Sequence, residues 1–163
     1  CGINMIDVAK IEYNNEDYIE FSRSKTKVYT RIKVHPAAKE IIYKYGGDGR
    51  LIKRVTERGY EQYMKLMNNV LQKIGDLKRV GLGGKKIIEV NPTYKDLTTY
   101  WARHTWATLM TSIDAPQDVI TMGLSHADAS MNAVYTKLDF DRLDQWNFKL
   151  IELVCRIRIC RGE

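Results

Sequence analysis

The segment YWARHTWATLM, residues 100–110, decides how the second half of this chain is expected to fold. Residues three and four apart lie on the same face of a helix. One face is mostly polar: Tyr100, Arg103, His104 and Ala107. The opposite face is large and apolar: Trp101, Trp106, Leu109 and Met110. We therefore expect a helix that the apolar face anchors in the core, with a guanidinium and an imidazole projecting together. A polar face that is merely solvated is the alternative.

The chain after this segment continues in a helical pattern. A short helix is expected to end at Gly123, and His126 follows it. Asp128 is a good N-cap for a further helix, which carries Tyr135 nine residues after His126. Helices are predicted over residues 95–112, 116–124, 128–135 and 141–158. The last helix has a strongly apolar face: Leu143, Trp146, Phe148, Leu150, Ile151 and Val154.

The first half of the chain changes from a helical to a strand period. Residues 4–11 have the pattern of the end of a helix, whereas residues 18–21 and 28–34 alternate apolar and polar side chains, as strands do. Residues 22–27 form the expected turn of this hairpin. Pro36 suits the first turn of a helix over residues 36–45, which Gly46 and Gly47 end.

A longer helix is predicted over residues 56–74, followed by a surface loop over residues 75–91 with at most a short strand at 87–90. The apolar face of that helix is expected in the core: Tyr63, Leu66, Met67, Val70, Leu71 and Ile74. The loop contains Gly81, Gly83, Gly84, Lys85 and Lys86, but their spacing is wrong for a phosphate-binding P-loop. We predict one α+β domain over residues 1–163, mainly α-helical, with a small antiparallel sheet near its N-terminus.

The composition supports a folded protein with an excess of positive charge. The 163 residues are 44% hydrophobic and 28% charged and include three prolines, which excludes disordered and collagen-like chains. Lys and Arg number 26 against 20 Asp and Glu, a net charge of +6 that suits a polyanionic partner without proving one.

The cysteines predict neither a disulfide framework nor a metal site. Three is an odd number, and Cys155 and Cys160 would diverge along a helix. No zinc-ligand spacing accompanies them, so we expect no metal and a reducing cytoplasm. No run approaches 18 apolar residues and no signal-peptide layout is present, so we expect no membrane association. The chain opens within an amphipathic pattern, at Cys1, which we interpret as the start of a fragment.

Four motifs resemble the tyrosine recombinases, also called phage-type integrases. The segments ARHTWAT at residues 102–108 and GLSH at 123–126, with Tyr135 nine residues further on, resemble the two C-terminal motif boxes of that family. GINMID at residues 2–7 resembles its first box, and RSKTK at 23–27 resembles the hairpin turn that bears its catalytic lysine. The resemblance implies the catalytic-domain fold of these enzymes. It also implies that the N-terminal core-binding domain and the start of the catalytic domain lie outside this chain.

The resemblance also implies the chemistry. The family cleaves DNA through a 3′-phosphotyrosyl intermediate that leaves a free 5′-hydroxyl, without ATP or any cofactor. Tyr135 would be the nucleophile, and Arg103 would hold the phosphate oxygens through a bidentate fork. Lys25 would protonate the leaving 5′-oxygen, with Lys27 as a competing candidate. His126 would either hydrogen-bond the phosphate or help to move a proton.

Two further site positions depart from the family's pattern. The first box usually carries an arginine where this chain has Asn4, which brings no positive charge. The second box usually has a histidine where this chain has Tyr100, which can donate to a phosphate but is no acid or base near pH 7. His104 is expected either to face DNA or to pack and orient its helix.

The implied partner is double-stranded DNA at a recombination site. Basic side chains are the candidates for phosphate contacts: Lys25, Lys27, Arg31, Arg50, Lys53, Arg54, Arg58, Lys85 and Lys86. In relatives the C-terminal helix docks on a neighbouring subunit of a homo-tetramer, and docking on its own domain is the alternative here. The expected setting is the bacterial cytoplasm, at the nucleoid.

Two rival functions remain open from the sequence. A DNA-binding or architectural protein could keep the fold and lack cleavage, as the residues at Asn4 and Tyr100 allow. The other is a helical protein-interaction domain without nucleic acid, for which any DNA binding would be indifferent to salt and to Arg103→Ala.

Overall fold

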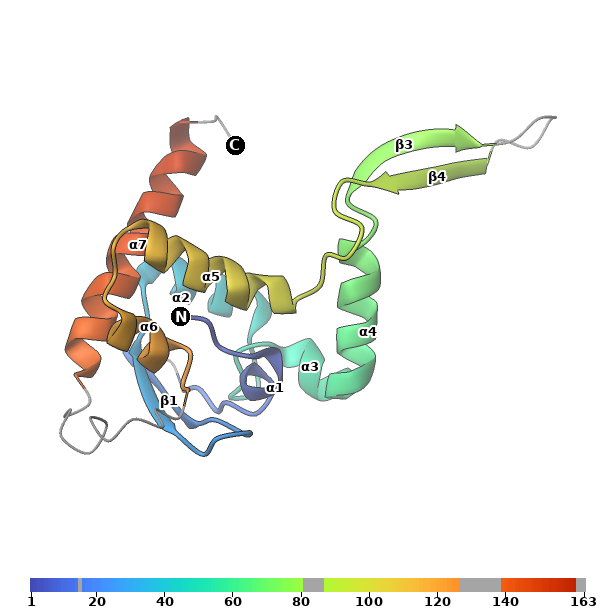
Figure 1. Cartoon of the computed structure of the whole chain (residues 1–163). Helices are drawn as coiled ribbons and strands as arrows, with labels where there is room; N and C mark the ends of the chain where they lie inside the picture. The colour runs from blue at the N-terminus through green and yellow to red at the C-terminus, as the bar shows by residue number, and fades with distance from the viewer. Residues whose placement is uncertain (15, 81–86, 127–138, 161–163) are drawn as a thin grey trace.

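The computed structural model of the chain describes residues 1–14, 16–80, 87–126 and 139–160 (Figure 1). The fold is mixed α+β and about half helical, with two small antiparallel sheets of two strands each. The predicted α+β class is confirmed at this level. The helix predicted over residues 128–135 lies outside the described residues, and so does Tyr135.

The first sheet is the hairpin predicted near the N-terminus. Strand β1 (Tyr18–Ser22) pairs antiparallel with β2 (Tyr29–Lys33). Ile19 lies opposite Ile32, and both side chains are buried because alternate residues of a strand face the same side. Residues 23–28 connect the strands, so the turn that carries Lys25 is where the sequence pattern predicted it.

The helices around this hairpin follow from their capping residues. Helix α2 (Pro36–Tyr45) has the predicted bounds, because Pro36 opens it and the Nδ1 atom of His35 accepts a hydrogen bond of 3.1 Å from the backbone N–H of Ala37. Helix α1 (Met5–Val8) is a single turn and is shorter than the predicted residues 4–11.

The single long helix predicted over residues 56–74 is wrong. Helix α3 (Lys53–Arg58) and helix α4 (Tyr60–Leu71) meet at Gly59, whose φ of +77° lies in the left-handed region that glycine tolerates best. The expected core face is also wrong in part. Tyr63 is buried, but the apolar side chains nearer the helix end are 42–51% exposed: Leu66, Val70 and Ile74. In Figure 1 α4 lies at the edge of the molecule, and its contacts with the residue before α5 are made by Met64 and Asn68 instead of these three side chains.

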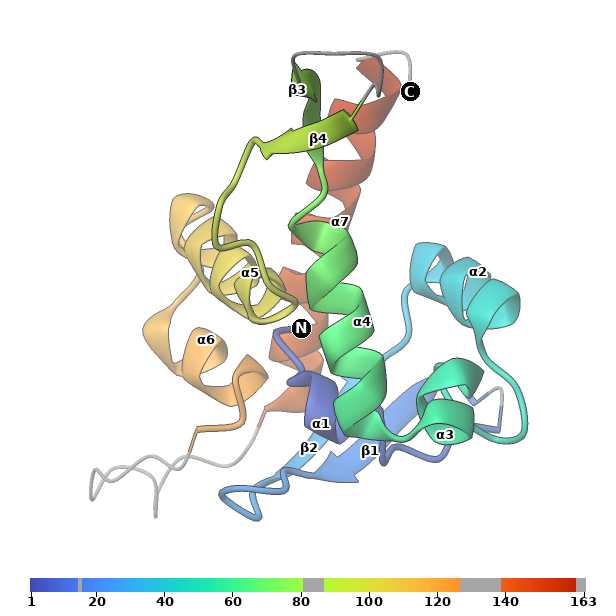
Figure 2. The same ribbon diagram turned by 90° about the vertical axis from the view of Figure 1, so that its right-hand side faces the viewer.

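The loop predicted over residues 75–91 is also wrong, because it forms a second hairpin. Strand β3 (Gly75–Val80) pairs antiparallel with β4 (Ile87–Pro92), so the short strand expected at 87–90 is one half of it. A Cβ on Gly75 would lie 2.1 Å from the carbonyl oxygen of Asn91, which requires glycine at this position. Figures 1 and 2 show the hairpin at the far end of α4, away from the other sheet.

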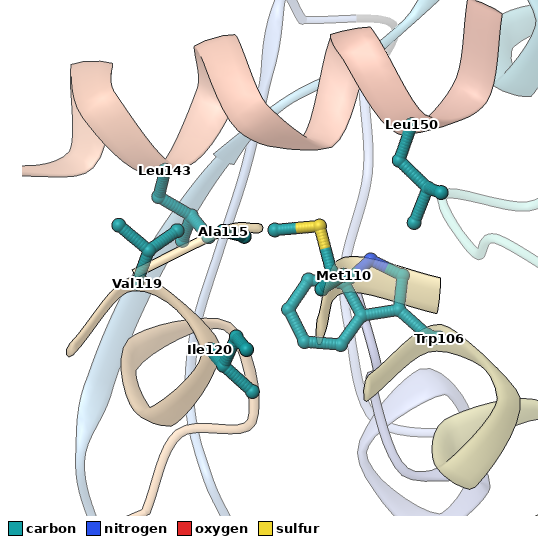
Figure 3. Close-up of a cluster of buried hydrophobic side chains, with 7 residues drawn as sticks. All are labelled: Trp106, Met110, Ala115, Val119, Ile120, Leu143 and Leu150. Atoms are coloured by element: carbon teal, nitrogen blue, oxygen red, sulfur yellow. The ribbon is translucent and has the colours of Figure 1, made fainter. Parts of the chain in front are cut away.

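The main core joins three helices of the second half. Helices α5 (Tyr100–Ser112), α6 (Gln117–Gly123) and α7 (Phe140–Cys160) surround a buried cluster that Figure 3 shows. Its members are Trp106, Met110, Ala115, Val119, Ile120, Leu143 and Leu150. The expected burial of Trp106 and Met110 is confirmed. Trp101 is instead 44% exposed and lies beside Tyr94, with ring centroids 6.3 Å apart, so its predicted place in the core is wrong.

Helix α7 docks on its own domain. It packs against β2, α5 and α6, and its buried residues Leu143 and Leu150 face the core cluster (Figure 3). The ring of Phe148 meets that of His35 edge-on, with centroids 4.7 Å apart. Among the described residues, no helix combines the length and the apolar character that crossing a membrane requires.

Candidate functional site

Arg103 is buried between the start of the chain and the end of α6. Only 6% of it is exposed, and its Nη1 atom donates to the carbonyl oxygen of Gly2. Its Nη2 atom donates to the carbonyl oxygen of Leu124, at 2.5 Å. The expectation that Arg103 projects freely beside His104 is therefore wrong, because two backbone carbonyls hold its guanidinium. The same contacts fix the direction of the fork, and two of its five N–H donors are used in holding it.

Arg103 lines a hollow together with both residues that depart from the recombinase pattern. The hollow has a volume of about 180 Å³, and Asn4 and Tyr100 are in its wall. Tyr100 is 50% exposed, and its ring meets the ring of the exposed His104 edge-on, with centroids 4.7 Å apart. The structure therefore brings together Asn4, Tyr100 and Arg103, from α5 and from the segment that precedes α1.

The turn between β1 and β2 is tied to the residue that precedes His126. Arg23 donates from Nη1 to the carbonyl oxygen of Ser125 at 3.1 Å, and the Thr26 hydroxyl donates to the same oxygen at 3.0 Å. The Thr30 and Ser125 hydroxyls lie 2.7 Å apart, within hydrogen-bond distance. These contacts join the turn that carries Lys25 to the segment that carries His126, so two predicted site residues belong to one connected unit.

His126 also experiences the positive charge of Arg103. His126 keeps an exposed surface, yet partial burial of its ring lowers the pKa of the imidazole. The positive charges of Arg103, Arg23 and Lys25 lower that pKa further. Three of the predicted catalytic residues, Arg103, Lys25 and His126, are therefore within electrostatic reach of one another.

Arg23 is a site residue that the sequence analysis did not single out. It is 8% exposed, and with burial it lowers the pKa of Arg103. Asp7 and Tyr100 oppose that lowering. A signal for Arg23 was present in the sequence, because Ile19, Phe21 and Arg23 alternate along one face of the hairpin and the first two point inward.

Asp7 connects the first motif segment to the hairpin turn. It is 3% exposed, and its carboxylate accepts a hydrogen bond of 2.8 Å from the backbone N–H of Ser24. Among the described residues it is the carboxylate that counters Arg103. One carboxylate against Arg103, Arg23 and Lys25 leaves an excess of positive charge, which suits an anionic ligand.

Several of the basic residues predicted to contact phosphates already have acidic partners. Arg31 pairs with Asp141 at 2.7 Å and lies over the ring of Tyr18. Two others lie in ion pairs at 3.3 Å: Arg50 with Glu12 and Lys53 with Asp48. Exposed candidates with no ion pair among the described residues are Lys25, Lys27, Arg54 and Arg58. Lys85 and Lys86 lie outside the described residues.

No three side chains of the metal-ligating kinds gather anywhere in the part of the chain that the structure describes. A scan of protein families finds no match to this chain, and searches of curated proteins and of solved structures find none either. The functional interpretation therefore rests on the site geometry and on the sequence motifs.

Proposed function

We propose that this chain is the catalytic domain of a site-specific tyrosine recombinase, an integrase of a mobile element that cleaves and rejoins DNA. One observation supports this most strongly. Arg103, Lys25 and His126 come from three distant segments and share one electrostatic neighbourhood. The same three residues match separate motifs of the recombinase family, in the order of that family.

The proposed reaction transfers a phosphodiester bond to a tyrosine. The Tyr135 phenolic oxygen gives its proton to a base, a role open to the neutral His126 imidazole, and forms a bond to phosphorus as the bond between phosphorus and the 5′-oxygen breaks. The electron pair leaves with that oxygen, which takes a proton from Lys25. The 5′-hydroxyl of a partner strand later reverses the step. The phosphotyrosyl bond conserves the energy of the broken bond, so neither ATP nor a cofactor is needed.

Arg103 would act on the phosphate in this reaction. A guanidinium held by backbone carbonyls does not need to reorganise when negative charge develops on the nonbridging oxygens. The N–H donors that neither the two carbonyls nor Tyr100 hold would contact those oxygens. Removing one such donor typically lowers the rate about 10²- to 10³-fold.

His126 would enter this reaction as a neutral imidazole. Partial burial and then the neighbouring cations lower its pKa, which favours the neutral form at pH 7. A neutral imidazole can donate to a phosphate oxygen through one nitrogen and accept a proton on the other. Both of the roles expected from the sequence remain available to it.

A covalent trapping experiment tests the function. The intact protein is incubated with nicked duplexes of randomised sequence that lose the 5′-hydroxyl strand after cleavage, and adducts are separated under denaturing conditions. We expect an adduct with the unaltered protein and with Tyr43→Phe, since Tyr43 is 94% exposed and lies outside the site. We expect none with Tyr135→Phe. An adduct that survives Tyr135→Phe contradicts the proposed nucleophile.

A DNA-binding protein without cleavage is the second candidate, and Asn4 favours it because it leaves the first box without its arginine. In that case the protein binds duplex DNA, and the binding weakens as salt rises because phosphate contacts release counterions. No adduct forms. In either case we place the protein on double-stranded DNA in the bacterial cytoplasm, as part of a homo-tetramer when it recombines.

A further inference from the structure

We infer that Arg23 is a positioning residue of the proposed site, which holds His126 against the Lys25 turn and supplies the second guanidinium that is missing at Asn4. The inference rests on the proposed function and deepens it. Asn4 lines the same hollow as Arg103, but its side chain carries no charge. Arg23 brings that charge from a different segment, the end of β1.

Burial of Arg23 is the first observation. The residue is 8% exposed and has no ion pair with a carboxylate in the described ranges. Its Nε atom is buried and has no hydrogen-bond partner among the described residues. An arginine is seldom buried without a carboxylate, because the charged group loses its hydration. Arg31 and Arg50, in contrast, each have an acidic partner. The buried charge of Arg23 suits a ligand that is itself an anion.

The conformation of Ser125 is the second observation. Its φ of +50° lies in the left-handed region, which a residue with a side chain seldom adopts unless the surrounding contacts hold it there. Arg23 and Thr26 both donate to its carbonyl oxygen, and its hydroxyl meets that of Thr30. The hairpin therefore sets the backbone direction immediately before His126.

The arrangement of charge is the third observation. Three cations from two elements face His126: Arg103 from α5, and Arg23 and Lys25 from the hairpin. The positive charge of Arg23 also lowers the pKa of Arg103, and the negative charge of Asp7 partly opposes this lowering. Two guanidiniums and an ammonium thus act electrostatically on the imidazole. A phosphodiester would therefore meet two guanidiniums here, although Asn4 brings no charge.

Nuclear magnetic resonance of the His126 ring tests the inference without relying on cleavage. The pKa of His126 is measured by titration in the unaltered protein and in three variants. In Arg23→Gln the pKa should rise, because a neighbouring positive charge is lost. In Thr26→Val the His126 pKa should remain unchanged, because that variant removes a hydrogen bond to the same Ser125 oxygen without removing charge. Arg142→Gln is the matched control, since Arg142 is a half-exposed arginine paired with Asp118.

Trapping with the nicked duplexes gives the second readout. Arg23→Gln should slow adduct formation about 10²-fold, the typical effect of losing an electrostatic group at a reacting phosphate. Arg23→Lys restores the charge without the bidentate fork. It should recover part of the rate lost in Arg23→Gln and return the His126 pKa most of the way to its value in the unaltered protein.

Two outcomes overturn the inference: a His126 pKa in folded Arg23→Gln that equals that of the unaltered protein, or a shift in Arg142→Gln that equals the shift in Arg23→Gln. If the unaltered protein forms no adduct while the His126 pKa moves as expected, the proposed function fails and the placement of Arg23 stands.

Discussion

Replacing Arg103 with lysine separates the geometry of the guanidinium from its charge. Arg103 donates to two carbonyl oxygens, of Gly2 and Leu124, and so joins the start of the chain to the end of α6. A lysine ammonium keeps the charge but is a single point without the planar fork, so we expect it to reach one of these oxygens. A hydrogen bond from a charged donor contributes about 1.5–3 kcal/mol. Arg103→Lys should therefore lower the free energy of unfolding by about that amount.

Urea denaturation followed by tryptophan fluorescence measures this change, because Trp106 lies in the core beside α6. With a slope of about 1–3 kcal/mol per molar urea, the midpoint should fall by roughly 1 M. Arg142→Lys is the control, since its ion pair is exposed and should contribute less than about 1 kcal/mol. If Arg103→Lys unfolds at the same urea concentration as the unaltered protein, the two carbonyl contacts do not hold the fold together.

Three further predictions concern the core and the dependence on pH. Leu143→Ala should lower the free energy of unfolding by about 2–5 kcal/mol because Leu143 is 0% exposed, whereas Leu153→Ala, at a residue that is 43% exposed on the same helix, should cost far less by urea denaturation. Gly123→Ala should cost about 1–3 kcal/mol, because a Cβ there would lie 2.3 Å from the Trp106 ring; if Trp106→Phe does not reduce that cost in a double-mutant cycle, the clash is not its cause. His126 has a lowered pKa, so the unfolded chain binds its proton more readily and the free energy of unfolding should fall as the pH drops below about 6.5. His126→Gln should make that fall shallower between pH of about 7.5 and 5.5, and an unchanged slope would count against the charges assigned to Arg103, Arg23 and Lys25.

Elements with local signals could be predicted from the sequence. Pro36 and the glycines after residue 45 define both ends of α2, and alternation over residues 18–21 defines most of β1. The order of the last helices followed from apolar periodicity and from Gly123. In each case the side chains that carry the signal also make the contact that stabilises the element, so a local pattern was sufficient.

Elements that depend on distant contacts could not be predicted in this way. The apolar spacing that begins at Tyr63 indicated one helix over residues 56–74, yet the chain turns at Gly59, where glycine allows a φ of +77°. Strands β3 and β4 pair with each other, but their sequences show little alternation of apolar and polar residues. The glycines between them in the sequence therefore favoured a loop. Trp101 shows the same limit, because its size predicts burial but its face of α5 meets no core.

The candidate site was predictable in its residues and not in its contacts. Motif spacing identified Arg103, Lys25 and His126 without showing that Arg103 is buried against two carbonyls. It also did not single out Arg23, because alternation with Ile19 and Phe21 indicates only that Arg23 faces inward, and its contact with Ser125 is not visible in the sequence. The contacts of Arg103 with Gly2 and of Arg23 with Ser125 each join residues about a hundred positions apart, which a local pattern does not report.

The central claim is that Tyr135 attacks DNA through its phenolic oxygen. Mass spectrometry of a digested protein–DNA adduct tests it most directly, because the peptide that retains a nucleotide identifies the linked side chain. We expect a single modified peptide in which Tyr135 bears a 3′-phosphate linkage. A nucleotide attached to another residue, or attached through a 5′-phosphate, would contradict it.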